Sequence, residues 1–523
     1  MTTWRTGVHL FLAAFLFSQC LAPHRPARAQ DVRQPATQPS HYFTIEILDD
    51  QTNRGVPLVE LKTVSNVRLY TDSAGLVAID DPALLGRDVY FSISSHGYEF
   101  PKDGFGFRGQ RLTLTPGGAA KLKIKRLNIA ERLYRITGEG IYRDSVMLGR
   151  PVPITKPLLN AQVTGQDSAL AVVYRGKIRW FFGDTMRQSY PLGHYWTAGA
   201  TSQLPANDGL DPSTGINLDY YSGADGFSRG VLPRVEGTPC WLDALMVLKD
   251  GNGADRMLAR SSLVKGVGKT IGRQLVVWND GKNVFDVLEQ IPLDAPVYPS
   301  GHPFRVEDDG AQWIYSGDCF PTVRTKADWQ SVQDFGSYEA FTCLPPGSSR
   351  GKNPTLDRDQ NGRLIWAWKK NTAALQAGQL AEMLKSGKLK QEEARLLPLD
   401  VESRKPVVFT MGSVAYNAFR KKWILIAHQL GGETSHLGEI WYAEADHPEG
   451  PWPWARKIIT HDRYSFYSPV QHPFFEQQGG RIVYFEGTYA TTFSRDNDPT
   501  PRYDYNQIMY RLDLADPRLK LPG

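Results

Sequence analysis

Short runs that alternate apolar and polar residues recur along most of the chain, a pattern typical of β-strands joined by tight turns. The clearest example is residues 167–184, where two apolar runs flank Arg175-Gly176. A hairpin folded about that dipeptide places Asp167 opposite Asp184 at its open end. Facing Cβ atoms on antiparallel strands lie roughly 5 Å apart, so the two carboxylates repel unless a proton or a ligand lies between them. We therefore expect chemistry at this pair.

Four further segments repeat the hairpin pattern, each with an inner strand, a polar turn and a returning partner strand. They begin near Thr238, His302, Ser413 and His472, and they turn near residues 250–253, 308–310, 420–422 and 478–480. Their spacing is irregular, without a strict repeat period. Five such units predict an all-β fold, a five-bladed β-propeller over residues 155–515, whose inner strands start at one rim of a central channel.

Residues 41–125 carry shorter alternating strands separated by turn signals, which predict a small β-sandwich domain. The order of strand, residues 71–75, strand and residues 95–98 resembles the carboxypeptidase regulatory-like or transthyretin-like modules of exported bacterial enzymes. That resemblance implies a spacer. A polar linker over residues 30–40 precedes this module, and a connecting segment over residues 126–154 follows it.

A helical pattern interrupts the strands between the third and fourth units, at residues 372–393. Leu375, Leu380, Met383 and Leu384 fall on one side of a helix there. We expect an inserted helix that either forms the wall of a cleft or decorates the surface.

The beginning of the chain has the features of a secretory signal peptide over residues 1–29, with an apolar run at 8–17 and a small-residue exit at 27–29. We therefore expect export to the periplasm or the cell exterior. Cys20 raises the alternative of a lipid anchor, but Gln19 before it is bulkier than lipid attachment favours. No later stretch is apolar enough to span a membrane.

Composition supports a folded, turn-rich protein. Of the 523 residues, 41% are apolar and 11% aromatic, with 48 Gly and 35 Pro. The net charge of +5 is spread without a dense basic run, which argues against a nucleic-acid partner. Beyond the signal, Cys240, Cys319 and Cys343 lack zinc-site spacing, and the last two could form a disulfide. We expect a monomer.

Paired carboxylates at a sugar-sized opening are what glycosidic bond cleavage requires, because one must be ionised while the other donates a proton. Proximity itself separates their two pKa values. Asp167 and Asp184 are the main catalytic candidates. Glu236, just before the second inner strand, is a further candidate for the proton donor. The alternatives are that Asp184 only caps its own turn and that Glu236 is a solvated loop residue.

Several short motifs resemble those of bacterial five-bladed propeller glycosidases, namely the arabinan-cleaving enzymes and the endo-D-arabinanase-like domains that carry a Gly-Asp-Thr motif. The motifs are residues 180–185, 412–417, 439–443 and 448–452. The resemblance implies that Asp167 is the base or nucleophile and that Asp184 is the carboxyl residue of Gly-Asp-Thr. In the arabinanases a Glu-Gly-Pro or Glu-Ala-Pro motif carries the general acid. Here the comparable Glu236-Gly-Thr-Pro has an extra residue, which leaves the identity of the acid open.

Histidines and acids are expected at the same channel. His302 and His472 begin inner strands, His428 ends a return strand, and Asp318 and Glu486 lie opposite them. Such a set could hold a divalent cation, and the resembling propellers often carry a hydrated calcium on their axis, although no cofactor is required by the sequence. The other interpretation is a set of His–carboxylate hydrogen bonds that close the ring.

A polysaccharide lyase is the alternative enzyme. His302 or His472 with Tyr467 or Tyr489 would remove the proton next to a uronic carboxylate, and Arg260 would neutralise that carboxylate.

The prediction for the whole chain is an exported glycoside hydrolase that binds a polysaccharide or oligosaccharide. Trp241 and Asn417, on inner strands of the second and fourth units, join the histidines, Arg260, Asp318, Glu486 and Tyr489 as expected substrate contacts. The rival from another class is a propeller that only binds a glycan or a partner.

Overall fold

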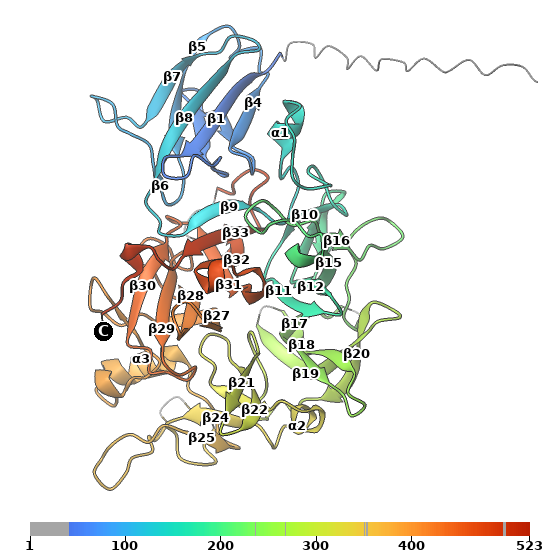
Figure 1. Cartoon of the computed structure of the whole chain (residues 1–523), viewed down its shortest axis with the longest axis vertical. Helices are drawn as coiled ribbons and strands as arrows, with labels where there is room; N and C mark the ends of the chain where they lie inside the picture. Colours follow the sequence, from blue (N-terminus) through green and yellow to red (C-terminus); the bar gives the residue numbers. More distant parts are fainter. Residues whose placement is uncertain are drawn as a thin grey trace, which may run out of the picture. The chain divides into compact units, whose positions relative to one another are not determined.

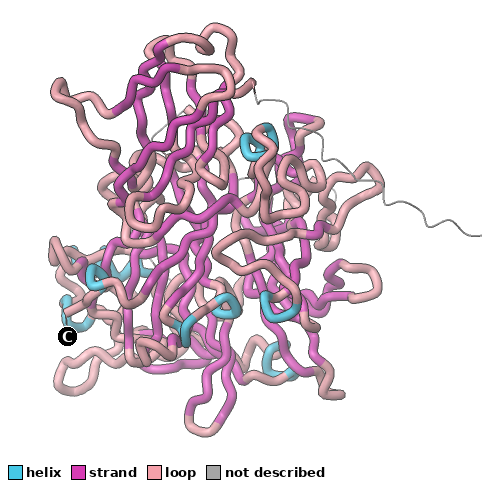
Figure 2. The backbone as a smooth tube through the Cα atoms, turned by 45° about the horizontal axis from the view of Figure 1, so that its top comes forward, coloured by secondary structure: helices cyan, strands magenta, loops and turns pink. Residues whose placement is uncertain are grey.

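Strands make up nearly all of the regular structure in the computed structural model, which describes residues 41–235, 237–266, 268–349, 351, 354–494 and 498–522 (Figures 1 and 2). The helical elements within those residues are short: α1 (Arg143–Met147), α2 (Trp329–Gln333), α3 (Ala377–Lys385), and the 3-10 turns η1 (Pro205–Asn207), η2 (Gln391–Glu393), η3 (Pro473–Phe475), η4 (Gln478–Gly480) and η5 (Pro517–Leu519). None of these is long and apolar enough to cross a membrane. The prediction of a nearly all-β chain is confirmed.

Residues 43–126 form two four-stranded sheets with one shared core. Their strand orders are β4-β1-β8-β6 and β3-β2-β5-β7. The strands are β1 (Phe43–Asp49), β2 (Glu60–Thr63), β3 (Arg68–Tyr70), β4 (Leu76–Ile79), β5 (Asp88–Ser94), β6 (Tyr98–Glu99), β7 (Gly109–Thr113) and β8 (Ala119–Arg126). Burial alternates along β5, so one face of that strand turns inward. Ile45, Leu61, Phe91 and Ile124 meet there, fully buried.

Five sheets of four or five strands follow, which we call the five larger sheets to distinguish them from a three-stranded sheet. Their inner strands, at residues 170–174, 240–249, 304–308, 409–417 and 465–471, lie nearest their common centre (Figure 1). The first two sheets contain β11 (Leu170–Tyr174), β12 (Lys177–Phe182), β15 (Ala198–Gln203) and β16 (Asp219–Tyr220), then β17 (Cys240–Lys249), β18 (Asp255–Lys265), β19 (Lys269–Asn279) and β20 (Val284–Gln290). A three-stranded sheet consists of β10 (Val163–Gln166), β13 (Thr185–Arg187) and β14 (Tyr190–His194). Along the chain, its strands alternate with those of the first of the five larger sheets.

The remaining three sheets have the same antiparallel pattern, apart from one parallel edge strand, β26. Their strands are β21 (Phe304–Asp308), β22 (Ala311–Ser316), β23 (Val323–Lys326), β24 (Glu339–Thr342) and β25 (Ala367–Lys370); β27 (Phe409–Asn417), β28 (Lys422–Gln429), β29 (Ile440–Ala445), β30 (Trp454–Ile459) and β26 (Leu399–Asp400); and β31 (Ser465–Gln471), β32 (Ile482–Ala490) and β33 (Asn506–Asp513). Each sheet is open and none closes on itself within the described residues.

The last sheet gains its edge strand from an earlier part of the chain. β9 (Glu131–Arg135) pairs antiparallel with β33, with Tyr134 opposite Met509. Residues 126–154 are expected from the sequence to form a connecting segment, whereas residues 131–135 within them form this strand. The pairing ties the end of the chain to the residues that precede the first of the five sheets.

The hairpin at residues 167–184 forms with the predicted register. β11 and β12 pair Tyr174 with Lys177, and the ladder continues to Leu170 opposite Phe181. Arg175 and Gly176 have φ values of 50° and 74°, the positive values that a two-residue hairpin turn of this kind requires.

The segment that starts at His472 differs from the prediction. The inner strand is β31, which ends at Gln471, and residues 473–475 form the 3-10 turn η3. Pro473 has no backbone N–H to donate to a ladder, so the strand ends before it. His472 therefore stands at the end of an inner strand instead of its beginning.

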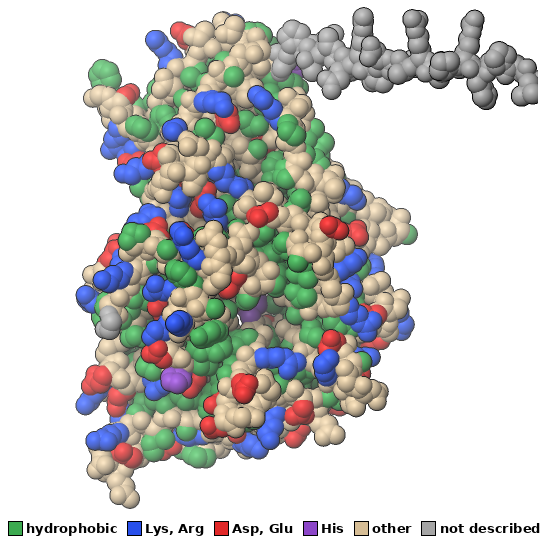
Figure 3. Space-filling view, viewed as in Figure 1, with side chains coloured by type: hydrophobic (Ala, Val, Ile, Leu, Met, Phe, Trp, Pro, Cys, Tyr) green, Lys and Arg blue, Asp and Glu red, His purple; other side chains and the backbone are tan. Residues whose placement is uncertain are grey.

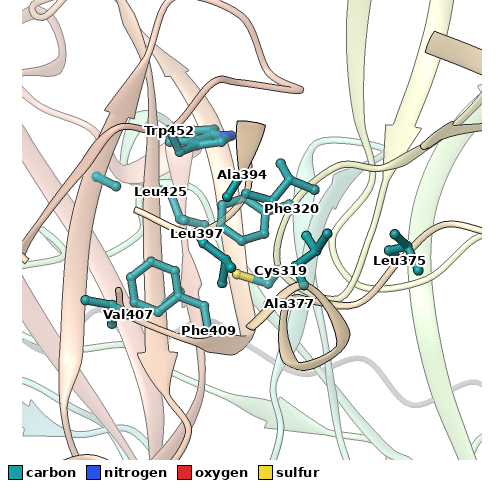
Figure 4. Close-up of a cluster of buried hydrophobic side chains, with 14 of the residues drawn as sticks. Cys319, Phe320, Leu375, Ala377, Ala394, Leu397, Val407, Phe409, Leu425 and Trp452 are labelled. Atoms are coloured by element: carbon teal, nitrogen blue, oxygen red, sulfur yellow. The ribbon is translucent and has the colours of Figure 1, made fainter. Parts of the chain in front are cut away.

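The predicted insertion contains α3, and its apolar side is buried in a core cluster. Leu375, Leu380 and Met383 are at most 5% exposed and belong to the same cluster as Phe409. Figure 4 shows part of this cluster, with Leu375, Ala377, Phe320 and Phe409 among the labelled side chains. The insertion is thus integrated into the core between the third and fourth sheets.

Cysteine pairing is a second correction. Cys240, Cys319 and Cys343 are all buried and all free, so the disulfide between the last two is not formed.

Candidate active site

A cavity of about 700 Å³ lies at the N-terminal ends of the inner strands of the five larger sheets. We call it the carboxylate cavity. Each sheet contributes side chains to its lining, among them Asp167, Asp243, His302, Thr410 and Tyr467 in chain order. Figure 3 shows the surface hollowed at the centre of these sheets.

The backbone kinks at this level in four of the five sheets. Ser168, Ala244, Gly301 and Ser468 all have φ between 46° and 65°. Positive φ is uncommon for residues other than glycine, so the three non-glycine cases mark a local constraint held by the surrounding structure. Asp167, Asp243 and Tyr467 immediately precede such residues.

Asp167 and Asp184 lie together, as the hairpin register requires. The backbone N–H of Asp184 donates to Asp167 Oδ1 over 2.8 Å, and the Tyr467 hydroxyl donates to Asp167 Oδ2 over 3.0 Å. A Cβ atom at Gly183 would lie only 2.2 Å from Asp167 Oδ1. Glycine at position 183 is therefore what leaves room for the Asp167 carboxyl group.

Both carboxyl groups hold their protons more strongly than an ordinary Asp. Burial, followed by the charge of Asp184, raises the pKa of Asp167 to about 7, against hydrogen bonds from Tyr505 and Tyr467. Burial also raises the pKa of Asp184, against a hydrogen bond of 2.8 Å from Trp241 Nε1 to Asp184 Oδ1. Interacting carboxyls titrate as a pair. The pair thus retains a proton in the weakly acidic range, where isolated Asp side chains are ionised.

Arg260 lines the carboxylate cavity but is engaged by protein groups. It forms an ion pair with Asp243, and its Nε donates to the Pro299 carbonyl over 2.9 Å. Burial lowers the pKa of Arg260, but the charges of Asp243 and Asp318 outweigh this and the net shift is upward. The guanidinium is therefore neutralised within the protein.

His302, Asp318 and His428 also line the carboxylate cavity. Burial and the neighbouring His472 lower the pKa of His302 to about 4, against the charge of Asp318. The Ser468 N–H lies 3.2 Å from His428 Nδ1, which must accept this hydrogen bond, so Nε2 carries the proton and donates to Thr410 Oγ1. Burial lowers the pKa of His428 to about 3. Both rings are neutral at pH 7.

His472 and Glu486 are not at the cavity, which corrects their expected position. His472 Nε2 lies 2.9 Å from Glu486 Oε1, and both side chains are fully buried. The His472 ring contacts Trp180 and Phe475, which belong to an apolar core cluster. The reason is the strand end at Gln471, which places His472 beyond the residues of β31 that reach the cavity.

Asn417 and Tyr489 also lie elsewhere. Asn417 Nδ2 donates to the Gly480 carbonyl over 2.7 Å, so its amide holds a turn instead of a ligand. Tyr489 is buried, and its hydroxyl lies 3.0 Å from Nε2 of His96, a residue of the N-terminal sheets. Glu236 lies outside the described residues.

The predicted set of histidines and acids is not gathered around one point in the described residues. These residues contain no group of three or more His, Cys, Asp or Glu side chains placed to hold an ion. The predicted set fails because His472 and Glu486 are bonded to each other in the core, and His428 is bonded to Thr410 and Ser468.

Sequence reasoning missed Asp243, Tyr298 and three partly exposed apolar side chains of the cavity: Met411, Leu430 and Phe493. A signal for Asp243 was present. Asp167-Ser-Ala-Leu and Asp243-Ala-Leu both place an acid before small and apolar residues, just before the first inner strand and within the second. No such local signal marks the other four, because loops of different sheets bring them together.

Comparisons with known proteins identify similar solved structures only. No family model and no curated protein matches the sequence. Similar structures include a GH43_1 enzyme from Xanthomonas citri complexed with xylose (11% identity, 68% of this chain and 88% of that one, TM-score 0.34). Another is a putative exo-beta-1,3-galactanase from Bifidobacterium bifidum (9% identity, 74% of this chain and 94% of that one, TM-score 0.35). A third is an exo-1,5-alpha-L-arabinanase from a bovine ruminal metagenomic library (10% identity, 67% of this chain and 94% of that one, TM-score 0.33). Identities and TM-scores this low do not establish a shared fold or activity.

Proposed function

We propose that this chain is a glycoside hydrolase that uses Asp167 and Asp184 as its catalytic carboxyl pair. The observation that carries the proposal is their position: two carboxyl groups in backbone and side-chain contact, at the wall of a cavity large enough for a sugar chain. Ligand pockets in proteins are typically about 300–1,000 Å³, and this cavity falls within that range.

Hydrolysis of a glycosidic bond needs a proton on one carboxyl group and a charge on the other. The raised pKa values supply the first requirement, because the pair retains a proton in weakly acidic solution. The hydrogen bonds from Tyr467 to Asp167 and from Trp241 to Asp184 fix the orientation of both groups. Partly exposed apolar side chains at the cavity, such as Met411 and Phe493, offer faces on which a sugar ring can stack.

The architecture that agrees with this proposal is a five-bladed β-propeller preceded by a β-sandwich. The five larger sheets would be the blades, with the carboxylate cavity at the mouth of the channel. The motifs shared with arabinan-cleaving enzymes favour the same architecture.

A polysaccharide lyase is less compatible with the site. A lyase needs a cationic group free to neutralise the substrate carboxylate, whereas Arg260 is already paired with Asp243. Of the expected lyase residues, His472 and Tyr489 are away from the cavity, whereas His302 and Tyr467 line it. The Tyr467 hydroxyl already donates its hydrogen bond to Asp167.

Release of sugars from a panel of arabinans, galactans and xylans tests the proposal. We expect new reducing ends without unsaturation from the wild-type chain, and their release to be about 10²–10⁴-fold slower in Asp167→Asn or Asp184→Asn. Unsaturated ends would indicate a lyase, and retention without cleavage would indicate a binding protein. Either result would replace the hydrolase proposal.

We also propose that the protein is exported, because residues 1–29 have the features of a signal peptide, and that it is a monomer. Sequencing of the mature N-terminus from the producing cell should begin at Gln30. An uncut chain in the cytoplasm would contradict export, and a dimer mass in light scattering would contradict the monomer.

A further inference from the structure

A second cavity of about 320 Å³ adjoins the carboxylate cavity, and we call it the side lobe. Five residues line both cavities, which makes them parts of one continuous cleft: Arg260, Tyr298, Asp318, Thr410 and Leu430. The side lobe extends from this junction to the N-terminus of α3. Gln376 and Gly378 line it and are exposed, so this end of the cleft reaches solvent.

The junction between the two cavities is rigid. Two guanidinium groups lie over the Tyr298 ring, with Arg273 at 4.2 Å and Arg260 at 5.6 Å from its centroid. Arg260 is held by Asp243 and by the Pro299 carbonyl. A stacked and bonded aromatic wall keeps its shape when a ligand binds, which reduces the conformational entropy that binding removes.

The residues that line the side lobe are nearly all uncharged. Beyond the shared Arg260 and Asp318, every described residue that lines it is neutral. Its lining is formed by apolar side chains such as Phe320 and Leu375 together with Gln376, Thr322 and Ser300. A cavity of this kind suits the apolar ring faces and hydroxyl groups of neutral sugars, whereas it would leave a uronic carboxylate without a counter-ion.

We propose that the side lobe binds further units of a neutral glycan chain whose scissile bond lies at Asp167 and Asp184. The substrate is then an oligosaccharide or polysaccharide that crosses the junction at Tyr298, and the insertion that carries α3 forms one wall of its path. This inference rests on the proposed function for the position of cleavage. The binding of a neutral chain by the side lobe does not depend on turnover.

Gly378 offers a direct test because it lines the open end of the lobe and a Cβ atom there would meet nothing within 4 Å, so the backbone can accept the side chain of Gly378→Trp. Lys385→Trp is the matched control, since Lys385 is exposed on the same helix and does not line the lobe. The readout is affinity, by calorimetric titration, for oligosaccharides of two to six units from arabinan, galactan and xylan. Oligogalacturonides of the same lengths are the acidic comparison.

We expect the affinity of the wild-type chain for a neutral series to rise with length and to exceed that for oligogalacturonides. In Gly378→Trp the ratio of affinity for the longest to the shortest oligosaccharide should fall about tenfold, about 1.4 kcal/mol. In Lys385→Trp the ratio should stay at the wild-type value.

An unchanged ratio in Gly378→Trp, a preference for the acidic series, or no binding of any neutral series would overturn the inference. Length-dependent binding without release of sugars would leave the side lobe in place and refute the hydrolase proposal alone.

Discussion

At the residue scale, the carboxylate pair has two effects that can be measured separately. It lowers the stability of the folded protein, and it is the proposed site of catalysis. The pKa of Asp167 in the folded protein is raised from 3.8 to about 7. The folded state therefore binds more protons than the unfolded chain between these values, and its stability falls as the pH rises from about 4 to about 7. Above pH 7 the destabilisation is complete.

Asp167→Asn removes this ionisation. We expect the free energy of unfolding to rise by about 1–2 kcal/mol at pH 8, since one pKa unit corresponds to 1.36 kcal/mol and partial exposure reduces the effect. At pH 4 the variant should gain little. Hydrolysis should fall by about 10²–10⁴-fold. Denaturant unfolding at both pH values and sugar release measure the two effects, with the exposed Asp294→Asn as control. A variant that is destabilised at pH 8 would contradict the assigned pKa.

Gly183 tests how closely the carboxyl pair must be placed. In Gly183→Ala the new methyl group would lie 2.2 Å from Asp167 Oδ1, so the carboxyl group must move. A displacement of this kind can lower a rate about 10²-fold without unfolding the protein. Gly251→Ala is a suitable control, because a Cβ atom at Gly251 meets nothing within 4 Å. We expect a loss of sugar release in Gly183→Ala alone. Full activity in that variant would show that the position of Asp167 is not critical.

At the scale of elements, local hairpins were predictable and long-range pairings were not. The register of β11 and β12 follows from the turn at Arg175-Gly176 and the alternation of side chains, both of which are local. The pairing of β9 with β33 joins strands separated by most of the chain, and no short motif encodes it. For the same reason Asp167 and Asp184 could be paired from sequence, whereas Tyr467 and Trp241 as their hydrogen-bond partners could not.

The contact between the N-terminal sheets and the last of the five sheets contains two histidines, the half-buried His96 and the fully buried His461. His96 Nε2 lies 3.0 Å from the Tyr489 hydroxyl, and the rings of His96 and His461 are 5.8 Å apart. Burial, with the nearby Arg132, lowers the pKa of His96 from 6.5 to about 3. The unfolded chain therefore binds more protons below pH 6.5, and stability should fall as the pH drops toward 3.

We expect His96→Phe to be less stable than the wild type at pH 7.5 and more stable at pH 4.5. At pH 7.5 the lost hydrogen bond to Tyr489 costs about 1 kcal/mol. At pH 4.5 the variant avoids the protonation penalty, worth up to about 2–3 kcal/mol, and becomes the more stable form. Thermal denaturation from pH 4.5 to 7.5 shows the pH at which the variant and the wild type are equally stable. The control is His447→Phe, because His447 is exposed. Parallel curves for His96→Phe and the wild type would refute a neutral His96.

At the scale of the whole molecule, residues 41–523 cluster as one compact unit. The contacts between the N-terminal sheets and the rest are both apolar and polar. Leu58 is buried in a core cluster with residues of the fourth and fifth sheets. Asp72 Oδ2 accepts hydrogen bonds of 2.7 Å from both the N–H and the hydroxyl of Ser145, and the Tyr503 hydroxyl donates to the Thr71 carbonyl. Arg54 donates to the Leu133 carbonyl, on the edge strand β9.

These contacts argue against the spacer that the sequence suggests for residues 41–125. Removing them leaves the acceptors and donors of the remaining sheets without partners, at about 1–3 kcal/mol for each buried polar group. Because both parts share this interface, we expect one calorimetric unfolding transition for the chain lacking residues 1–40. Deletion through residue 126 should lower the midpoint by many degrees and reduce the soluble yield. A spacer joined only by its peptide link would give two unfolding transitions. The chain truncated through residue 126 would then unfold at the same midpoint as the corresponding part of the longer chain. That result would show that the interface does not stabilise the protein.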